Sequence, residues 1–502
     1  MGVDMRFRTM FAIAMLTLTA AVSAAPLKIG WAINDISTDK AVELAGTFHW
    51  RTSKGLRDPL MATALAIDNG EDCVVFLSMD FISPPTFVAN RVRKRVKAEI
   101  PDLPPEKVIF HATHIHTGVS IDRTEKKLRE EYSKYMADQI FKSVKEAWTS
   151  RKPGQIAYGY DLVVTAFNRR IVYFNDRKGG IGMSPQGKAV LHGRTNVPDF
   201  SHVEGGADPF ANYLFTYDME GKLTGAIINV GYTAQVSISD RYVSSDTWHD
   251  MRKLMAEHYP RVYILPQCAA AGEATFEQPY YKEAEKRRYR LIYGRDPAYP
   301  GEFQRKQIAG RILTSFDRAH EWAQKEKFSD LPIKHVVKTL KLDPAVPSKI
   351  DYEAAKDGLK KIQEYRENPK TTERMRSSLR SRENVCKRVV RTYENADKLP
   401  KVPMEFHVLR IGDVAFVSER FEYYFEFGQR IQARSPFIQT FTVQLAASNG
   451  PGGYLATERA SRNGGYGTRF LCPVSPKGGQ EIVEAAVKEL KALKAMDKTT
   501  QK

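Results

Sequence analysis

The sequence predicts an α/β protein in which a mixed β-sheet core is covered by helices and interrupted by an inserted helical segment. The first half of the chain alternates short apolar runs with longer segments that carry apolar residues at three- and four-residue spacing. Between about residues 351 and 398 a highly charged helical pattern replaces this alternation, and strand-like runs then return. Alternating strands and helices are typical of a sheet with helices on its faces.

Strands are predicted in the first half where β-branched and aromatic residues form short apolar runs. These runs cover residues 73–80, 107–114, 155–164, 212–218, 223–232 and 261–267. Helices are predicted at 89–100, at 127–148 and from about Asp246 onward, because apolar side chains recur there on one helical face. The first of these helices ends at Pro101, since proline breaks the helical hydrogen-bond pattern.

The second half begins with a charged helical stretch at about 280–327, broken near Pro297 and Pro300. A helical pair follows at 351–395 and is split at Pro369. We expect this pair to form an insertion or a lid on the sheet. Its basic face is typical of a solvated helix.

The chain returns to strands at 404–419 and 436–446, passes through a turn-rich loop to about residue 467, and ends in a predicted helix at 479–495. These late strands have no evident core of their own. We therefore expect them to complete the first sheet rather than to form a separate domain.

Residues 1–25 have the pattern of a secretory signal peptide. Arg6 and Arg8 precede an apolar run, and small residues then offer a cleavage site after Ala24 or Ala25. The run is short for the alternative, a membrane anchor, which needs about 20 apolar residues. Residues 26–502 are then the mature protein, which we expect to be secreted or periplasmic.

Composition sets limits on the function. The chain has 502 residues, four widely spaced cysteines without a CxxC pair, and a formal net charge of +17. A zinc site made only of cysteines is not expected, and Cys73, which opens a strand, fits a buried free thiol as well as a disulfide. No nucleic-acid motif accompanies the positive charge, so nucleic acid is not an expected partner. The basic segments 287–295 and 370–391 leave peripheral contact with an anionic membrane surface open, and the oligomeric state stays open too.

The segment VIFHATHIHTG places His111, His114 and His116 at the end of an apolar run, in a chain with 11 histidines. Side chains alternate between the two faces of a strand, so His114 and His116 are expected to point the same way and to reach one metal ion. Zinc accepts imidazole and carboxylate ligands and, in catalytic sites, a water. The residues alone leave one core histidine and one exposed histidine as an equal alternative.

Eight segments with distinctive residues follow one another along the chain. They are LKIGWAINDIS, GLRDPLMATALAIDNGEDCVVFLSMDF, HATHIHTG, FNRR, LTGAIINVGY, ILPQCAAAGE, FEYYFEFGQRIQARSPF and GGYLATERASRNGGYG. Together they resemble the neutral/alkaline non-lysosomal ceramidase family over nearly all of residues 26–502. The resemblance implies a zinc amidase that cleaves the amide bond of ceramide, a sphingolipid. Members usually carry a C-terminal immunoglobulin-like domain, which we do not expect here because only a helix follows GGYGTRF.

The resemblance also implies a metal site of two histidines from an HxH motif, a third histidine, a glutamate and a tyrosine. Carried over to this chain, the HxH pair is His114 and His116, the glutamate is Glu422 and the tyrosine is Tyr454. His111 then lies outside the ligand set, where it is expected to orient the loop or to polarise the substrate.

Two arginines of the FNRR segment are further candidates. Arg169 or Arg170 is expected to bind an anionic or polar part of the substrate. The alternative for both is a solvated or salt-bridged pair.

The family's third histidine is missing from this chain. After GAIINV, where it is expected, the chain has Thr233 and Gln235. Gln235 offers a carbonyl oxygen, a poorer zinc ligand than imidazole, and His249 or His202 is the other candidate replacement. His249 follows Asp246 at a predicted helix start, with Asp246 as the N-cap or as an acid that orients a ligand histidine. An exposed helical histidine is the alternative for His249.

A serine of the family is missing as well. The family carries a Gly-Asp-x-Ser-Pro motif, whereas this chain has Glu273 at the aspartate position and Thr275 at the serine position. Thr275 keeps a hydroxyl on a stiffer side chain, and a plain loop residue in a diverged site is the equal alternative. The turn 269–272 is a candidate oxyanion cradle.

These observations favour an exported zinc-dependent hydrolase that acts on an amide, or an ester, of a small-molecule or lipid substrate. A non-catalytic or redirected binding protein on the same fold is the second hypothesis, because the third histidine and the serine are lost. Hydrolysis of another substrate class, such as a glycan or an acylated sugar, is the third.

Overall fold

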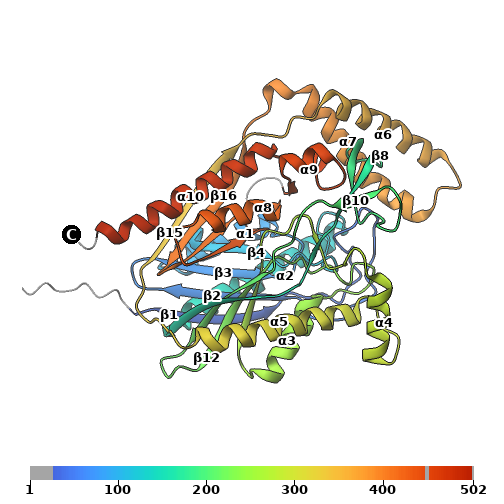
Figure 1. Ribbon diagram of the computed structural model, residues 1–502. Helices are drawn as coiled ribbons and strands as arrows, with labels where there is room; N and C mark the ends of the chain where they lie inside the picture. Colours follow the sequence, from blue (N-terminus) through green and yellow to red (C-terminus); the bar gives the residue numbers. More distant parts are fainter. Residues whose placement is uncertain (1–25, 447–451, 500–502) are drawn as a thin grey trace, which may run out of the picture.

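The computed structural model of the chain describes residues 26–446 and 452–499, so the predicted signal peptide lies outside the described residues. The fold is mixed α/β, as predicted, but it contains several sheets instead of a single one. Figure 1 shows the sheets in the middle of the molecule, with helices above and below them. No helix in the described part of the chain is long and apolar enough to cross a bilayer.

The first sheet has the strand order β4-β3-β2-β1-β5. Its strands are β1 (Lys28–Asp35), β2 (Met61–Asp68), β3 (Cys73–Met79), β4 (Val108–Ala112) and β5 (Lys152–Pro153). β3 and β4 are parallel and are joined through helix α1 (Thr86–Glu99), which packs beside α2 (Lys126–Thr149). Both β3 and β4 are buried along their whole length, as expected for strands covered on both faces.

The second sheet has the order β13-β12-β11-β6. Its strands are β6 (Gln155–Leu162), β11 (Phe210–Tyr217), β12 (Leu223–Val230) and β13 (Tyr263–Cys268), and helices α3 (Thr247–His258) and α5 (Glu302–Ala323) pack on it. Helix α3 begins where the sequence predicts, because the Asp246 carboxylate accepts a hydrogen bond from the backbone N–H of Thr247.

The late strands form a third sheet, so the prediction that they complete the first sheet is wrong. The order is β15-β16-β17-β19, with β15 (Ile333–Leu342), β16 (Val402–Ile411), β17 (Val414–Ser418) and β19 (Gln439–Val443). β15 was not expected, and it pairs with β16 over its full length. Helices α8 (Phe425–Arg434) and α10 (Pro476–Thr499) bury the outer face, which gives this sheet a core of its own.

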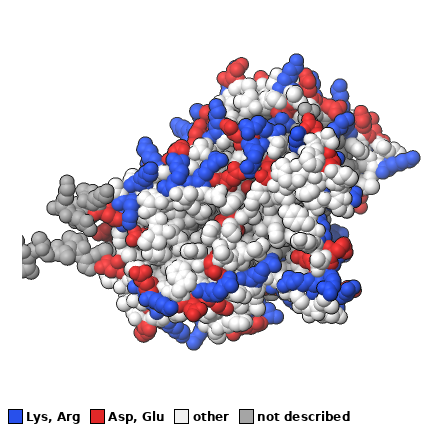
Figure 2. Space-filling view, viewed as in Figure 1, with Lys and Arg blue, Asp and Glu red and all other residues white. Residues whose placement is uncertain are grey.

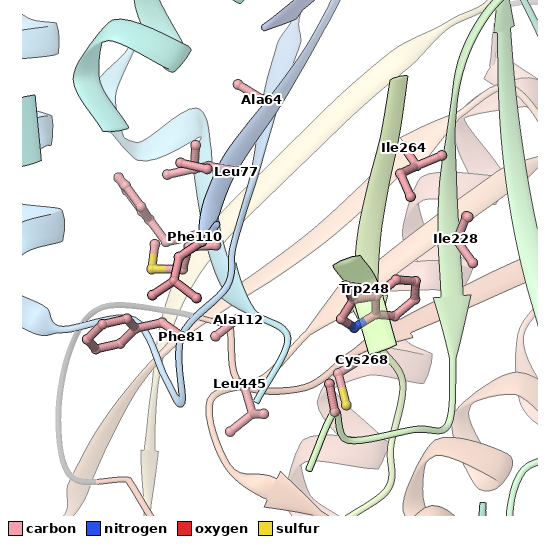
Figure 3. Packing of buried hydrophobic residues seen from close by; sticks show 14 of the residues in the cluster. Ala64, Leu77, Phe81, Phe110, Ala112, Ile228, Trp248, Ile264, Cys268 and Leu445 are labelled. Atoms are coloured by element: carbon pink, nitrogen blue, oxygen red, sulfur yellow. The ribbon is translucent and has the colours of Figure 1, made fainter. Parts of the chain in front are cut away.

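The inner faces of the three sheets share one hydrophobic core. Phe76 of the first sheet, Leu214 of the second and Phe416 of the third are buried there, and the rings of Phe76 and Phe416 lie 4.8 Å apart. Figure 3 shows the packing on the outer faces, with Phe110 on the side of the first sheet and Trp248 on the side of the second. Each such side chain contributes roughly 1.5–3 kcal/mol through burial, so the three sheets are held as one body.

The inserted helical pair is α6 (Lys349–Glu367) and α7 (Glu373–Glu394), separated at Pro369 as predicted. In Figure 1 it lies at the upper right, close to a small sheet of β8 (Arg170–Lys178), β9 (Gln186–Leu191) and β10 (Phe200–Val203). Residues of α7 pack against Phe48 and Phe470. The insertion therefore lies at the same end of the molecule as the loop that follows β4.

The remaining short elements connect these layers. They are β7 (Phe167–Asn168), β14 (Ala274–Thr275), α4 (Lys282–Tyr293), β18 (Glu422–Tyr423), β20 (Tyr454–Leu455), α9 (Glu458–Asn463) and the 3₁₀ turns at Pro105–Lys107, Ala396–Lys398 and Arg469–Leu471. All four cysteines are unpaired, and Cys73 is the buried free thiol that the sequence allowed.

Candidate functional site

The histidine segment leaves the sheet at the carboxyl end of β4. The strand ends at Ala112, so His114 and His116 lie in the following loop, and strand alternation is not what brings them together. Their rings nevertheless lie side by side, with centroids 4.9 Å apart. His114 has a backbone φ of +60°, a left-handed conformation that costs a non-glycine residue roughly 1–2 kcal/mol. Strain of this kind is concentrated at functional sites.

Neighbouring segments hold this loop in place. An Nη2 hydrogen of Arg51 is donated to the carbonyl oxygen of His116 at 2.6 Å, and the hydroxyl of Thr117 donates to the carbonyl oxygen of Ser244 at 2.8 Å. The ring of His116 lies against Gly46, where an added Cβ would be 2.2 Å from its Cγ atom. The position of His116 therefore depends on a residue without a side chain.

Glu422 and Tyr454 reach the histidines from two short strands. β18 and β20 pair in parallel, with Glu422 opposite Tyr454. An Oε2 atom of Glu422 lies 3.5 Å from Nε2 of His114, and Tyr454 accepts a hydrogen bond from Arg169 at 3.2 Å. The four ligands that the resemblance assigns to residues of this chain thus line one cavity, of about 470 Å³.

The hydrogen bonds of His114 fix where its proton lies. Its Nδ1 atom is 2.8 Å from the carbonyl oxygen of Ile82, which can only accept, so Nδ1 carries the hydrogen. In the neutral ring, Nε2 then presents a lone pair to the carboxylate of Glu422. Two acceptors at this distance need a cation between them, which is either a proton on Nε2 or a metal ion.

His116 adds a second unsatisfied group. Both of its ring nitrogens are buried and have no hydrogen-bond partner among the described residues. Burial, the neighbouring His114 and nearby arginines lower the pKa of His116 well below its usual value, so the ring is neutral and one nitrogen has a free lone pair. An ion pair between His114 and Glu422 would leave this nitrogen without a partner.

The charge states of Glu422 and Tyr454 complete the donor set. Burial opposes ionisation of Glu422, but His114, Tyr454 and Arg169 outweigh it and hold the pKa of Glu422 below its usual value. Burial and the neighbouring Glu422 raise the pKa of Tyr454, which keeps the phenol protonated. Two imidazoles, a carboxylate and a phenol oxygen fit zinc by type. Within residues 26–446 and 452–499, however, no group of three or more His, Cys, Asp or Glu side chains has an arrangement that could hold a metal ion.

Two solved structures resemble this chain. The crystal structure of neutral ceramidase from Pseudomonas aeruginosa matches with a TM-score of 0.62 and 16% identity, over 93% of this chain and 74% of that one. A ceramidase complexed with C2 matches with a TM-score of 0.63 and 17% identity, over 94% and 76% of the two chains. The chain has the neutral ceramidase fold. No protein-family model and no curated protein sequence matches it.

The candidates for the missing third histidine lie in different places on this ceramidase fold. Gln235 lines a second, adjoining cavity of about 570 Å³ together with His116. Its Nε2 atom donates to the hydroxyl of Thr233 at 2.6 Å, so its carbonyl oxygen is the group left for a cation. His249 lies 3.5 Å from Asp58, and His202 is exposed on β10; neither lines either cavity. Gln235 is thus the candidate that shares a cavity with His116.

The two arginines of the FNRR segment have different surroundings. Arg169 is buried, donates to the carbonyl oxygen of Gly272 at 2.9 Å and to Tyr454, and lines the larger cavity. Arg170 is fully buried, pairs with Glu204 and does not line either cavity. Arg170 is therefore the salt-bridged arginine that the sequence left open as an alternative to substrate binding. Arg169 is the arginine that lines a cavity and could contact a substrate there.

His111 and Thr275 lie behind the site. His111 is on β4 with both ring nitrogens buried, and burial lowers its pKa to about 3. Thr275 is buried on β14, where it pairs with Phe167 and its hydroxyl accepts a hydrogen bond from the backbone N–H of Glu277 at 3.3 Å. Neither residue lines the two cavities, so a role for either in the reaction stays a prediction.

The turn at 269–272 offers few free donors. The backbone N–H of Ala271 donates to the side chain of Gln444, and that of Gly272 donates to the carbonyl oxygen of Tyr423 at 2.8 Å. The buried carboxylate of Glu273 accepts a hydrogen bond from the N–H of Phe425 at the start of α8, and burial raises its pKa to about 7. The predicted oxyanion cradle is therefore already used to hold the turn and α8 together.

Sequence reasoning missed several residues of the cavity walls. The two cavities share Gly46, Thr47, Phe48, His116, Tyr454 and Tyr466. The loop around Phe48 carries no motif that marks it as part of a site. Arg382 of α7 also lines the larger cavity, although the basic pattern of that helix predicts a solvated face.

Proposed function

We propose that this protein is an exported zinc-dependent hydrolase that cleaves the amide bond of an N-acyl lipid or a related small molecule. The proposal depends above all on one contact: Nε2 of His114, whose proton is fixed on Nδ1, faces the carboxylate of Glu422 at 3.5 Å. The unpartnered ring of His116 beside them and the neutral ceramidase fold support it.

In this proposal, His114, His116, Glu422 and Tyr454 would hold the zinc ion after a closer approach of their side chains than this structure shows, and Gln235 would take the place of the third histidine. When bound, zinc would polarise the substrate carbonyl and lower the pKa of a water molecule to about 7. The chain itself leaves a ring nitrogen of each histidine free to bind a metal ion. The carbonyl oxygen of Ile82 fixes the proton of His114 on Nδ1, and burial keeps His116 neutral.

The surrounding residues have positioning roles in this proposal. Arg169 holds the hydroxyl of Tyr454 and remains a cation beside it. The adjoining cavity of about 570 Å³ is of the size that binds small molecules, and the apolar side chains among its lining residues would contact the acyl part of a substrate.

A binding protein without catalytic activity is the second candidate function. A protonated His114 paired with Glu422 would satisfy these two groups without a metal ion, and Thr275 lies outside both cavities. The unpartnered nitrogens of His116 count against this reading, since buried polar groups are usually satisfied.

Hydrolysis by the zinc-loaded chain tests the proposal. We expect cleavage of a fluorogenic short-chain N-acyl amide, and a loss of roughly a hundredfold or more in H114A and E422Q. H249A is the matched control, because His249 lines neither cavity. A panel of esters and acylated sugars separates the other substrate classes. If the zinc-loaded chain cleaves none of these compounds, the hydrolase proposal fails.

A further inference from the structure

The larger cavity has walls of one charge sign. Among the described residues, its charged lining residues are Arg169, Arg177, Lys178, Arg374 and Arg382, with no Asp or Glu. The whole chain has 76 Lys and Arg and 59 Asp and Glu, so a random set of its charged residues would include acids. The described lining residues of this cavity therefore differ in charge from the rest of the chain. A cavity lined by charges of one sign focuses the field on its contents.

Arg382 of α7 is a partly buried member of this set, and it forms no ion pair with a carboxylate of the described residues. It donates to the carbonyl oxygen of Ile181 at 2.7 Å and to the hydroxyl of Ser378 at 3.3 Å, and its guanidinium carbon lies 5.0 Å from the ring centroid of Phe48. Burial lowers the pKa of Arg382, and no carboxylate of the described residues is among the groups that counter this effect. Arg177, by contrast, is paired with Asp199. A half-buried guanidinium without an anion is a costly arrangement that an anionic ligand would relieve.

The same helix presents another such cation to the smaller cavity. Arg388 lines that cavity, donates to the carbonyl oxygen of Phe470 at 2.6 Å, and has its pKa lowered by burial without a compensating carboxylate. Helix α7 therefore turns two partly desolvated arginines toward the two cavities.

A chain of aromatic contacts connects Arg382 to the proposed zinc ligands. Beyond the Phe48 ring, which Arg382 covers, the ring of Tyr466 lies 5.8 Å away, and the ring of Tyr454 lies 5.4 Å from that of Tyr466. Tyr454 is the residue opposite Glu422 in the strand pair. The cationic wall and the His114–Glu422 contact therefore belong to one continuous site.

We propose that the substrate of this protein is an anionic N-acyl compound, one that carries a carboxylate or a phosphate group bound by Arg382 and the cationic wall. This inference rests on the proposed hydrolase function and goes beyond it by naming the substrate class. The same cavity has apolar lining from Met183, Val190, Leu191 and Ile238, which accommodates an acyl chain beside the charge. An uncharged amide leaves the guanidinium unpaired and is disfavoured for that reason.

Matched substrates test this proposal. N-dodecanoylglycine, N-dodecanoylphosphoethanolamine and N-dodecanoylethanolamine share the acyl chain and the amide, and the third is uncharged. We expect kcat/KM to be roughly tenfold or more higher for an anionic compound, and the ratio of the first two distinguishes carboxylate from phosphate. R382Q is expected to remove the preference and R382K to retain part of it. R391Q, on the same helix but in neither cavity lining, is the control that keeps the preference.

A binding measurement separates this inference from the proposed reaction. In calorimetry on the full chain, we expect decyl phosphate below its micellar concentration to bind at least about tenfold more tightly than decyl glucoside, and R382Q to lose the difference. If decyl phosphate is preferred but no amide is cleaved, the hydrolase proposal fails and the ligand class stands. If the uncharged amide is cleaved as fast as the anionic ones and R382Q behaves as wild type, the ligand class is overturned and the hydrolase proposal stands.

Discussion

At the scale of single residues, the site depends on where protons lie. The carbonyl oxygen of Ile82 places the proton of His114 on Nδ1, and this leaves Nε2 and Glu422 as two facing acceptors. The HxH motif marks His114 and His116 as candidate ligands in the sequence, with one core and one exposed histidine as the equal alternative. Glu422 and Tyr454 were selected only by the family resemblance, because two-residue strands far apart in the chain carry no pattern of their own.

Gly46 gives a direct test of the position of His116. A Cβ at residue 46 would lie 2.2 Å from Cγ of His116, and the backbone φ of +88° is itself unfavourable for alanine. We expect G46A to lower the free energy of unfolding by roughly 1–3 kcal/mol and to impair the proposed hydrolysis. G310A, a helix position with open space around it, is the control and should be neutral or stabilising by up to about 1 kcal/mol. Equal unfolding free energies for G46A and wild type, measured in urea, would contradict the packing described here.

Asp208 predicts a pH dependence of stability. Burial raises its pKa from 3.8 to about 6, opposed only by a hydrogen bond from the N–H of Phe210. Between these values the folded state holds a proton that the unfolded chain has released, so the free energy of unfolding falls as the pH rises through this window. The loss is about 3 kcal/mol, because a pKa difference of one corresponds to about 1.4 kcal/mol.

D208N isolates this contribution, since asparagine cannot ionise. Relative to wild type, D208N is expected to gain stability between about pH 4 and pH 7, as measured by urea unfolding at both values. A wild-type protein and a D208N variant with parallel pH profiles would show that Asp208 titrates normally in the fold.

At the scale of elements, the spacing of apolar residues predicts which side chains share one face of a helix or strand. It does not predict which part of the chain packs against that face. The split helical pair and the helix after Asp246 are where the sequence predicts them. β15 was missed because its pattern, IKHVVKTLKL, mixes lysines with apolar residues and shows no strict alternation of burial. The basic pattern of α7 predicts a solvated face, whereas Arg382 and Arg388 line the cavities.

Helix α4 is the element that fits the expected contact with a membrane surface. None of its residues is buried. Large apolar side chains at its two ends are exposed, with Tyr281 74% and Leu291 63% accessible, and five basic residues accompany them: Lys282, Lys286, Arg287, Arg288 and Arg290. An exposed helix of this composition is attracted to anionic lipid. We propose that α4 contacts such a surface.

Vesicle sedimentation tests this role of α4. We expect the protein to sediment with phosphatidylglycerol-containing vesicles more than with phosphatidylcholine vesicles, and L291S/I292S to reduce the bound fraction severalfold. M219S removes an equally exposed apolar side chain from a turn elsewhere and serves as the control. Unchanged sedimentation of L291S/I292S would rule out α4 as the contact.

At the scale of the whole molecule, three sheets share one core, and the site lies at the edge where their loops meet the helical insertion. The sequence predicts the α/β class but a single sheet, whereas the described residues form three large sheets and three small ones. Hydrophobic patterns do not show which strands are neighbours. The net charge of +17 is not confined to one surface patch, because basic and acidic residues occur along the whole chain. Figure 2 shows Lys and Arg interleaved with Asp and Glu along the upper and lower parts of the visible face, with a largely uncharged band between them.

The four unpaired cysteines predict that the fold does not depend on disulfides. Cys73, Cys268 and Cys386 are buried and Cys472 is partly buried. We expect four reactive thiols per chain in denaturant without reductant, and the same melting temperature with and without dithiothreitol. A melting temperature that falls on reduction would contradict this assignment.

Metal content is the most direct test of the central proposal, that His114, His116 and Glu422 hold a zinc ion. The measurement is the zinc bound per chain, by mass spectrometry of the purified protein after zinc loading and removal of free metal. We predict about one zinc per chain in wild type and in H111A, whose ring lies outside the cavities, and roughly none in H114A and E422A. A wild-type protein without stoichiometric zinc, and with the same melting temperature before and after chelation, would contradict the account.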